Sequence, residues 1–240
     1  MSRLILLPGW GLGPAALQPL AGALCEQGLA VELAELPVLD SATPADWLDE
    51  LDARLPDDAW LGGWSLGGML ATVLAARRGA RCRGLLTLAS NACFVARADW
   101  PQAMTQDTFT AFRDGCAQDA GAILKRFALL CSQGCAEARG LSRLLNQGIP
   151  AEETAQRLAG LAVLAALDNR AALAAFAGPQ LHLLAEADAL VPAAAAEPLQ
   201  TLLPRGAVER LAGTGHAFVL ERPQALAARL AAFIREADDD

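Results

Sequence analysis

The sequence predicts an α/β protein in which a mostly parallel sheet is flanked by helices and carries an inserted, all-helical cap. Short apolar runs alternate with helical stretches over residues 4–90, a purely helical interval follows, and the alternation returns over residues 180–237. Such a rhythm is typical of a parallel sheet covered on both faces. Because segments on both sides of the insertion complete one sheet, we predict a single domain over residues 1–240 with a cap at about residues 98–175.

The first part of the chain contains four predicted strands and three predicted helices. Each strand is a short apolar or alternating run, and each helix has apolar residues at helical spacing. The strands lie within 4–10, 29–37, 59–64 and 82–90, and the helices within 14–28, 45–56 and 66–79. Gly28 closes the first helix as a C-terminal cap, and Gly79 closes the third after two arginines.

The cap interval has four stretches with helical spacing and no convincing strand. Glycines separate these stretches, and Pro150 opens the last of them. The predicted cap helices are 105–119, 120–134, 136–148 and 151–167. Beyond the cap, the predicted strands are 180–188 and 207–213, and the predicted helices are 193–206 and 223–237.

Composition excludes several classes of protein. With 54% hydrophobic and 19% charged residues in 240, the chain is unlike disordered proteins and can bury a large core. A net charge of −8 is unlike that of nucleic-acid-binding proteins. The longest apolar run, 158–167, is too short to span a bilayer, and the run at the N-terminus stops at Pro8, too early for a signal peptide. We therefore predict a cytoplasmic protein without nucleic-acid or membrane partners. We also expect it to be a monomer, an expectation that does not rest on the composition.

The cysteine and histidine content argues against a metal site. The six cysteines show no CxxC spacing, and the chain has only two histidines. We interpret the cysteines as reduced thiols that act as small apolar side chains. No metal and no cofactor are predicted.

A candidate nucleophile lies in the segment Gly63-Trp64-Ser65-Leu66-Gly67, which fits the pattern G-x-S-x-G. The segment separates a predicted strand from a predicted helix, which is the context this motif requires. Glycines flank the serine because side chains would clash in such a tight turn, and the helix that follows points its N-terminal amides at the reacting oxygen. The alternative is a glycine-rich turn that contains Ser65 by chance.

A nucleophilic serine needs a base and an acid that orients the base. His216 lies in a loop just after the last predicted strand, whereas the alternative, His182, lies inside an apolar strand and suits a core position. Asp188 ends the strand 180–188 and gives the chain order Ser, Asp, His. Glu186 is the rival acid, because residues two apart on a strand face the same side.

An oxyanion formed at Ser65 needs two backbone donors. We predict the N–H of Leu66, directly after the nucleophile, and the N–H of Trp10, in the loop that follows the first strand. The Trp10 indole would also wall the acyl pocket, or simply pack in the core.

These residues resemble the α/β-hydrolase superfamily and, within it, the pimeloyl-[acyl-carrier protein] methyl ester esterases of biotin synthesis. LPGWGLG resembles the first-loop motif of that family, and GWSLGG resembles its nucleophile turn. The stretch 86–101 is similar to the family's passage from strand to cap, and its part 90–101 together with the segment KRFALL narrows the resemblance to the esterases. This chain departs from the family pattern at Pro8, where a histidine is usual, and at Ala122, where an arginine would be expected.

The resemblance implies a substrate, a partner and binding residues. The family removes a methyl group from a pimeloyl chain carried on acyl-carrier protein, without a cofactor. The resemblance implies that the carrier, which is acidic, docks on the cap arginines Arg126, Arg139 and Arg143. It also implies that the acyl chain contacts Trp10, Ser65, Leu66, Phe127, Ala128, Leu129, Leu130, Cys131 and His216.

The distribution of charged residues also indicates a cationic cap, independently of the resemblance. Residues 121–146 hold four cationic residues and a single acidic one, Glu137, in a chain that is acidic overall. Arg139 and Arg143 are four residues apart and share a helix face. Guanidinium groups suit phosphate, although a solvated helix face explains the same pattern.

Two rival functions remain open at this stage. A general short-chain carboxylesterase or thioesterase would use the same Ser65, Asp188 and His216 on free acyl esters. A non-catalytic hydrolase-like protein would bind a ligand without turnover.

Overall fold

The computed structural model describes residues 2–203 and 206–239, and these residues form an α/β fold around a six-stranded, all-parallel sheet. The strand order is β2-β1-β3-β4-β5-β6. The strands are β1 (Arg3–Leu7), β2 (Ala30–Leu33), β3 (Ala59–Trp64), β4 (Cys82–Leu88), β5 (Gln180–Ala185) and β6 (Gly206–Leu211). The central strands β3 and β5 are buried along their whole length, as expected for a sheet that is covered on both faces.

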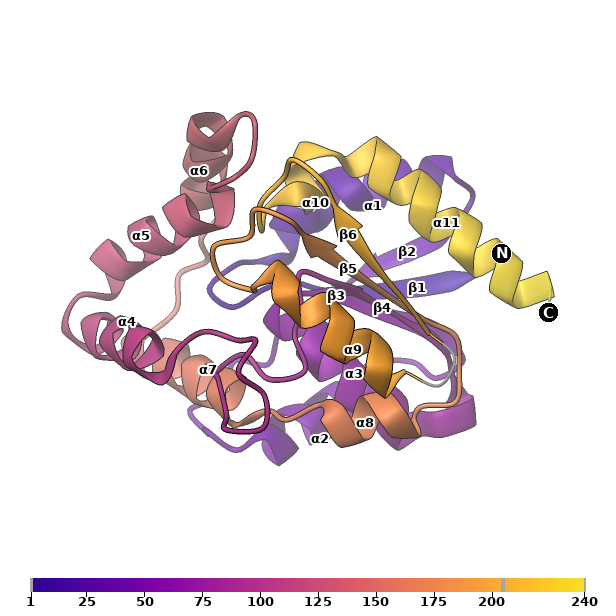
Figure 1. The fold of residues 1–240 in the computed structure, drawn as a ribbon, viewed down its shortest axis with the longest axis horizontal. Coiled ribbons are helices and arrows are strands. Elements are labelled where there is room, and N and C mark those ends of the chain that lie inside the picture. Colours follow the sequence, from indigo (N-terminus) through magenta and orange to yellow (C-terminus); the bar gives the residue numbers. More distant parts are fainter. Residues whose placement is uncertain (1, 204–205, 240) are drawn as a thin grey trace.

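Two helical layers cover the sheet (Figure 1). One layer contains α1 (Gln18–Glu26), α10 (Phe218–Glu221) and α11 (Pro223–Asp239), and α1 packs against α11. The other contains α2 (Pro44–Arg54), α3 (Leu66–Arg78), α8 (Arg170–Ala175) and α9 (Ala196–Leu202). Short 3-10 turns precede α1, follow α3 and precede α9; these are η1 (Pro14–Leu17), η2 (Gly79–Arg81) and η3 (Ala193–Ala195).

Four further helices lie beyond the carboxyl ends of the strands, on the side toward which the arrows of β5 and β6 point (Figure 1). They are α4 (Gln106–Gln118), α5 (Ala120–Ser132), α6 (Ala138–Gln147) and α7 (Thr154–Ala166). We call these four helices the cap. The last helix of the predicted cap interval, α8, packs instead against α3 and α9, so it belongs to a layer of the sheet.

Capping residues explain where several helices begin or end. Gly28 takes a φ of +86° after α1, which is the left-handed conformation expected of a C-terminal glycine cap. The Asp119 carboxylate accepts a hydrogen bond from the Ala122 N–H and begins α5, directly after α4. Glu153 and Gln156 form a capping box at the start of α7.

Several sequence predictions were wrong in extent or missed an element. The predicted helix 193–206 is η3 followed by α9, which ends at Leu202, and it includes residues 204–205, which lie outside the described residues. The predicted strand 29–37 is reduced to β2, because its only neighbour is β1, which ends before Pro8. The predicted strand 180–188 ends at Ala185, because the next residues form a turn in which the Asp188 N–H donates back to the Ala185 carbonyl (3.4 Å). The short helices α8 and α10 lie outside the predicted helices.

None of the described helices combines the length and apolar character needed to cross a membrane.

Candidate active site

Ser65 occupies a strained turn between β3 and α3. Its φ of 54° and ψ of −118° lie outside the regions that residues with a side chain favour, at a cost of about 1–3 kcal/mol. Three hydrogen bonds hold this conformation: Ser65 N–H donates to the Leu88 carbonyl (2.8 Å), and the Ser65 carbonyl accepts from the Ser90 hydroxyl (2.7 Å) and the Met69 N–H (3.1 Å). The strand, turn and helix predicted around the motif are thus confirmed, and strain is concentrated at its serine.

The two glycines of the motif are required by close backbone contacts. A Cβ atom on Gly63 would lie 2.2 Å from the carbonyl carbon of Gly67. A Cβ atom on Gly67 would lie 2.4 Å from the carbonyl oxygen of Leu7, at the end of β1. Contacts this short do not occur in folded proteins, so any larger residue would displace the turn that carries Ser65.

The structure brings Asp188 and His216 together in the interior. The Nδ1 atom of His216 lies 2.7 Å from Oδ2 of Asp188, and both side chains are fully buried. The other carboxylate oxygen accepts hydrogen bonds from the N–H groups of Leu190 (2.8 Å) and Val191 (2.9 Å). These two N–H groups fix the orientation of the carboxylate. Its second oxygen is then placed to accept a hydrogen bond from the Nδ1–H tautomer of His216.

The alternatives weighed from the sequence lie elsewhere. Glu186 is exposed, and the argument that it shares a strand face with Asp188 was wrong because β5 ends at Ala185. His182 lies within β5, where its Nδ1 atom is 2.7 Å from the Thr87 hydroxyl. Burial lowers the pKa of His182 to about 4, so this histidine is a neutral core residue at pH 7.

The second ring nitrogen of His216 is buried and unpartnered. Among the residues that the structure describes, no group forms a hydrogen bond with Nε2, including the Ser65 hydroxyl. The indole of Trp64, the residue before Ser65, donates to the His216 carbonyl at 3.0 Å, and the two rings lie 5.6 Å apart. A buried nitrogen without a partner costs free energy unless a ligand or a moving side chain completes it.

Leu66 directly follows Ser65, and the loop that carries Trp10 approaches Ser65 at Gly9. Leu66 begins α3, and Gly9 brings the loop after β1 so close that its Cβ would lie 3.5 Å from Cβ of Ser65. Within residues 2–203 and 206–239, no acceptor takes a hydrogen bond from the backbone N–H of Leu66 or Trp10. The Trp10 indole is fixed separately, because it donates to the Arg157 carbonyl at 2.9 Å.

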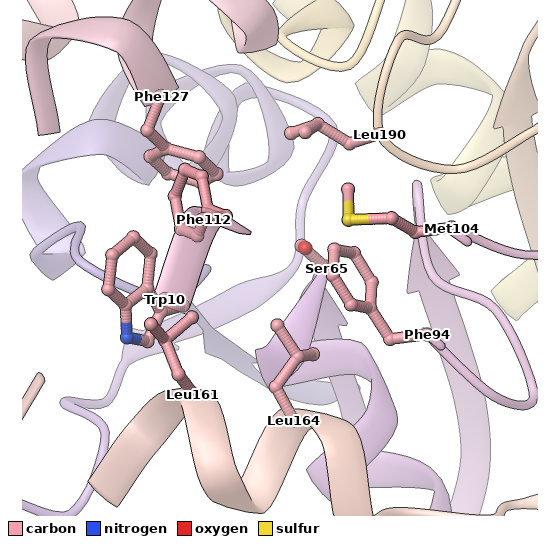
Figure 2. Close-up of a pocket in the computed structure, with 9 residues that line it drawn as sticks. All are labelled: Trp10, Ser65, Phe94, Met104, Phe112, Phe127, Leu161, Leu164 and Leu190. Atoms are coloured by element: carbon pink, nitrogen blue, oxygen red, sulfur yellow. The ribbon is translucent and has the colours of Figure 1, made fainter. Parts of the chain in front are cut away.

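A narrow apolar pocket with a cavity volume of about 20 Å³ opens at Ser65. Figure 2 shows the lining side chains around the Ser65 hydroxyl. They are Trp10, Phe94, Met104, Phe112, Phe127, Leu161, Leu164 and Leu190. Trp10 makes edge contacts with Phe112 (5.5 Å between ring centroids) and Phe127 (5.2 Å), so these three rings form one wall. Of the lining residues, only Trp10, Ser65 and Phe127 were predicted from the sequence.

The predicted acyl-contact segment 127–131 does not face the pocket as a whole. Phe127 lines it, and Ala128 and Cys131 are buried. Leu129 is 62% exposed, and Leu130 lines a neighbouring surface groove together with Arg126. Leu129 therefore points away from the acyl pocket.

The predicted carrier-docking arginines are exposed and form no ion pair with any residue in 2–203 or 206–239. Arg126 lies on α5, and Arg139 and Arg143 lie on α6. Among the described residues, six cations form no ion pair, namely Lys125, Arg126, Arg139, Arg143, Arg210 and Arg235. Four of these six are on α5 and α6, so the unneutralised positive charge of an acidic chain is concentrated on the cap.

In the part of the chain that the structure describes, no group of three or more His, Cys, Asp or Glu side chains is placed to hold a metal ion. The six cysteines are free thiols, and five of them are buried.

Comparison with known proteins gives one family and several relatives. A sequence model described as the alpha/beta hydrolase family matches residues 4–229. The biotin biosynthesis bifunctional protein BioHC of Cellvibrio japonicus is 40% identical over 93% of this chain, which spans only 45% of that longer protein. The pimeloyl-[acyl-carrier protein] methyl ester esterase of Aromatoleum aromaticum is also 40% identical, over 92% of this chain and 93% of that protein.

Solved structures agree on the fold. An esterase from Exiguobacterium antarcticum matches with a TM-score of 0.86 at 17% identity, over 98% of this chain and 92% of that one. A bromoperoxidase from Bacillus anthracis matches with a TM-score of 0.85 at 18% identity, with the same coverage. At such low identity the likeness concerns the architecture alone.

Proposed function

Since the chain belongs to the alpha/beta hydrolase family and, within it, to the family of the pimeloyl-[acyl-carrier protein] methyl ester esterases, we propose that it removes the methyl group from a pimeloyl chain carried on acyl-carrier protein. The observation that carries this proposal is the arrangement at Ser65. A strained serine opens into an apolar pocket, and a fully buried His216–Asp188 pair with a 2.7 Å hydrogen bond lies against Trp64, the residue before Ser65. This arrangement suits acyl transfer from an ester to water.

In the proposed reaction, the Ser65 hydroxyl attacks the methyl ester carbonyl while Nε2 of His216 takes the hydroxyl proton. The unpartnered Nε2 is available for this proton, and Asp188 holds the opposite nitrogen in the Nδ1–H tautomer. The carbonyl oxygen becomes an oxyanion, which the free N–H groups of Leu66 and Trp10 stabilise.

The tetrahedral intermediate then collapses. Its C–O bond to the methoxy group breaks, and the proton on His216 passes to the leaving oxygen, so that methanol departs. Water then gives a proton to His216 and attacks the acyl carbon. The bond to Ser65 breaks, the proton returns to the Ser65 oxygen, and the free carboxylate product is released. These steps need no cofactor.

The pocket supports an acyl chain as substrate. Aromatic and aliphatic side chains surround the Ser65 hydroxyl, and burial of each methylene of a bound chain contributes about 0.8 kcal/mol. Phe112 from α4, Phe127 from α5 and Leu164 from α7 all contact this space, so the cap helices would set the length of chain that fits.

The charge of the cap supports an acidic partner. Arg126, Arg139 and Arg143 have no carboxylate partner among the described residues, so an incoming carboxylate or phosphate would meet guanidinium groups that these residues leave free. We therefore include acyl-carrier protein in the proposal as the partner that presents the ester. Attraction of this kind weakens with salt, because the screening length falls from about 10 Å at 0.1 M to about 3 Å at 1 M.

The test compares methyl pimeloyl-carrier protein with dimethyl pimelate as substrates, each at low and high salt. We expect a preference for the carrier-linked ester that is lost at high salt and in the double variant Arg139→Ala/Arg143→Ala. The matched control is Arg210→Ala/Arg235→Ala, which removes two unpaired cations that lie away from the cap.

Each contrary outcome selects one of the other functions. Equal turnover of both substrates at every salt concentration would make the chain a general carboxylesterase or thioesterase. Absence of turnover, together with no labelling of Ser65 by a fluorophosphonate, would make it a non-catalytic binding protein.

A further inference from the structure

The turn between α5 and α6 contacts both loops that carry the proposed acid and base. We call residues 133–137 the cap turn. A Cβ atom on Gly134, in the cap turn, would lie 2.5 Å from the carbonyl oxygen of Ala187. A Cβ atom on Gly215 would lie 1.9 Å from the carbonyl oxygen of Gln133. The backbones touch at both places, so the cap turn packs against the Asp188 loop on one side and the His216 loop on the other.

Hydrogen bonds join the same three segments. The Ala217 N–H donates to the Cys131 carbonyl at the end of α5 (2.8 Å), and the Ala187 N–H donates to the Thr214 carbonyl (3.0 Å). The Glu221 carboxylate accepts from the Ala136 N–H (2.5 Å) and from the Thr214 hydroxyl. Glu221 therefore ties the cap turn to the loop that precedes His216.

The sheet alone does not fix these two side chains. Asp188 lies three residues beyond the end of β5, and His216 lies five residues beyond the end of β6. The contacts with the cap turn fall on their immediate neighbours, namely Ala187 before Asp188 and Gly215 before His216. A displaced cap turn would therefore move the acid and the base directly.

We propose that the cap turn is a positioning element for the His216–Asp188 pair, with Gly134, Gly215 and Glu221 as its positioning residues. This inference rests on the proposed function, because it concerns how the acid–base pair is held for ester hydrolysis. It assigns the cap a part in turnover itself, separate from its contacts with an acyl chain or a carrier protein.

The first test is Gly134→Ala, with Gly28→Ala as a matched control. Both glycines have a φ of +86°, so both substitutions carry the same backbone strain, but a Cβ on Gly28 has nothing within 4 Å. Moving the contact at Gly134 from 2.5 Å to an ordinary separation of about 3.5 Å requires a shift of about 1 Å. A misplacement of that size costs about 10²-fold in rate.

We therefore expect Gly134→Ala to lower kcat for p-nitrophenyl acetate about 10²-fold with KM nearly unchanged. Gly28→Ala should keep the wild-type kcat, although it carries the same backbone strain. The chain has only two histidines, so ¹⁵N-imidazole spectra report on each of them. The signals of His216 should shift in Gly134→Ala, while those of His182 in the sheet should not.

A second, milder pair of variants covers the case in which Gly134→Ala does not fold. Glu221→Ala removes the tie between the cap turn and Thr214, whereas Glu221→Gln keeps a carbonyl oxygen for the Ala136 N–H. We expect a loss of kcat and shifted His216 signals in the alanine variant, and recovery of both in the glutamine variant.

Failure of this inference is distinguishable from failure of the proposed function. If the wild-type protein hydrolyses no ester, the proposed function fails, and the His216 spectra alone decide whether the cap turn positions the ring. The positioning role is overturned if the wild type is active and neither variant differs from its reference in kcat or in the His216 signals. The reference for Gly134→Ala is Gly28→Ala, and the reference for Glu221→Ala is the wild type.

Discussion

The substitution Asp188→Asn tests the proposed base most directly, because the surroundings of the carboxylate dictate how the amide must sit. One carboxylate oxygen accepts two N–H groups, from Leu190 and Val191, and the other faces Nδ1 of His216 at 2.7 Å. Placing the amide NH₂ against the two N–H donors would leave buried donors unpaired, at about 1–3 kcal/mol each. The amide oxygen therefore stays there, and the NH₂ group faces His216.

This orientation forces the wrong tautomer on His216. Nδ1 must then accept a hydrogen bond from the amide, so the ring proton moves to Nε2, and that nitrogen cannot take the proton of Ser65. The same change in a serine protease triad lowers kcat about 10⁴-fold, and we expect a fall of that order here, equivalent to about 5 kcal/mol in the barrier.

The assay is kcat on p-nitrophenyl acetate, with circular dichroism to show that the variant is folded. Glu186→Gln is the matched control, because it makes the same chemical change at the exposed neighbouring acid and should leave kcat unchanged. A value of kcat within tenfold of the wild type in Asp188→Asn, or a comparable loss in Glu186→Gln, would refute the assignment of Asp188.

Three further predictions follow from the same structure. Ser65→Ala should lower turnover by several orders of magnitude while the melting temperature stays within a few degrees, as kinetics and thermal unfolding would show. Leu164→Phe narrows the pocket, so kcat/KM for p-nitrophenyl esters of eight carbons should fall more than for the acetate. Burial lowers the pKa of His182 to about 4, below the value of about 6.5 in the unfolded chain. The stability that this group contributes is therefore present above pH 6.5 and lost as the pH falls through 4. We expect the free energy of unfolding in urea to fall over this pH range by about 3 kcal/mol less in His182→Gln than in the wild type.

The proposed chemical residues could be predicted from the sequence because each is constrained within its own segment. The close contacts at Gly63 and Gly67 leave a signature in five consecutive residues. His216 follows a strand, and so does Asp188, even though the strand before Asp188 is shorter than predicted. The error in β5 arose because a turn closed by the Asp188 N–H and the Ala185 carbonyl takes the backbone away from the sheet, a contact that leaves no pattern in the apolar run.

The acyl pocket could not be predicted in the same way. Most of its lining residues come from a loop and two cap helices, and no sequence pattern around them distinguishes them from other core residues. They are Phe94, Met104, Phe112, Leu161 and Leu164. Helix geometry also explains the error at Leu129. Successive helical residues are about 100° apart, so Phe127 and Cys131 share the inner face, while Leu129 between them points to solvent.

The contrast separates two kinds of constraint in this fold. Backbone contacts around the turn admit only glycine at positions 63 and 67, so the local sequence specifies the turn that carries Ser65. The walls of the pocket depend on how the cap helices pack against Trp10, and many apolar residues would satisfy that packing. The cap turn combines both kinds of constraint, because Gly134 and Gly215 are fixed by backbone contacts that join the cap to the acid and base loops. If these contacts position His216, substitutions in the cap helices can change the acyl specificity without moving the base. The cap turn between α5 and α6 must then keep Gly134.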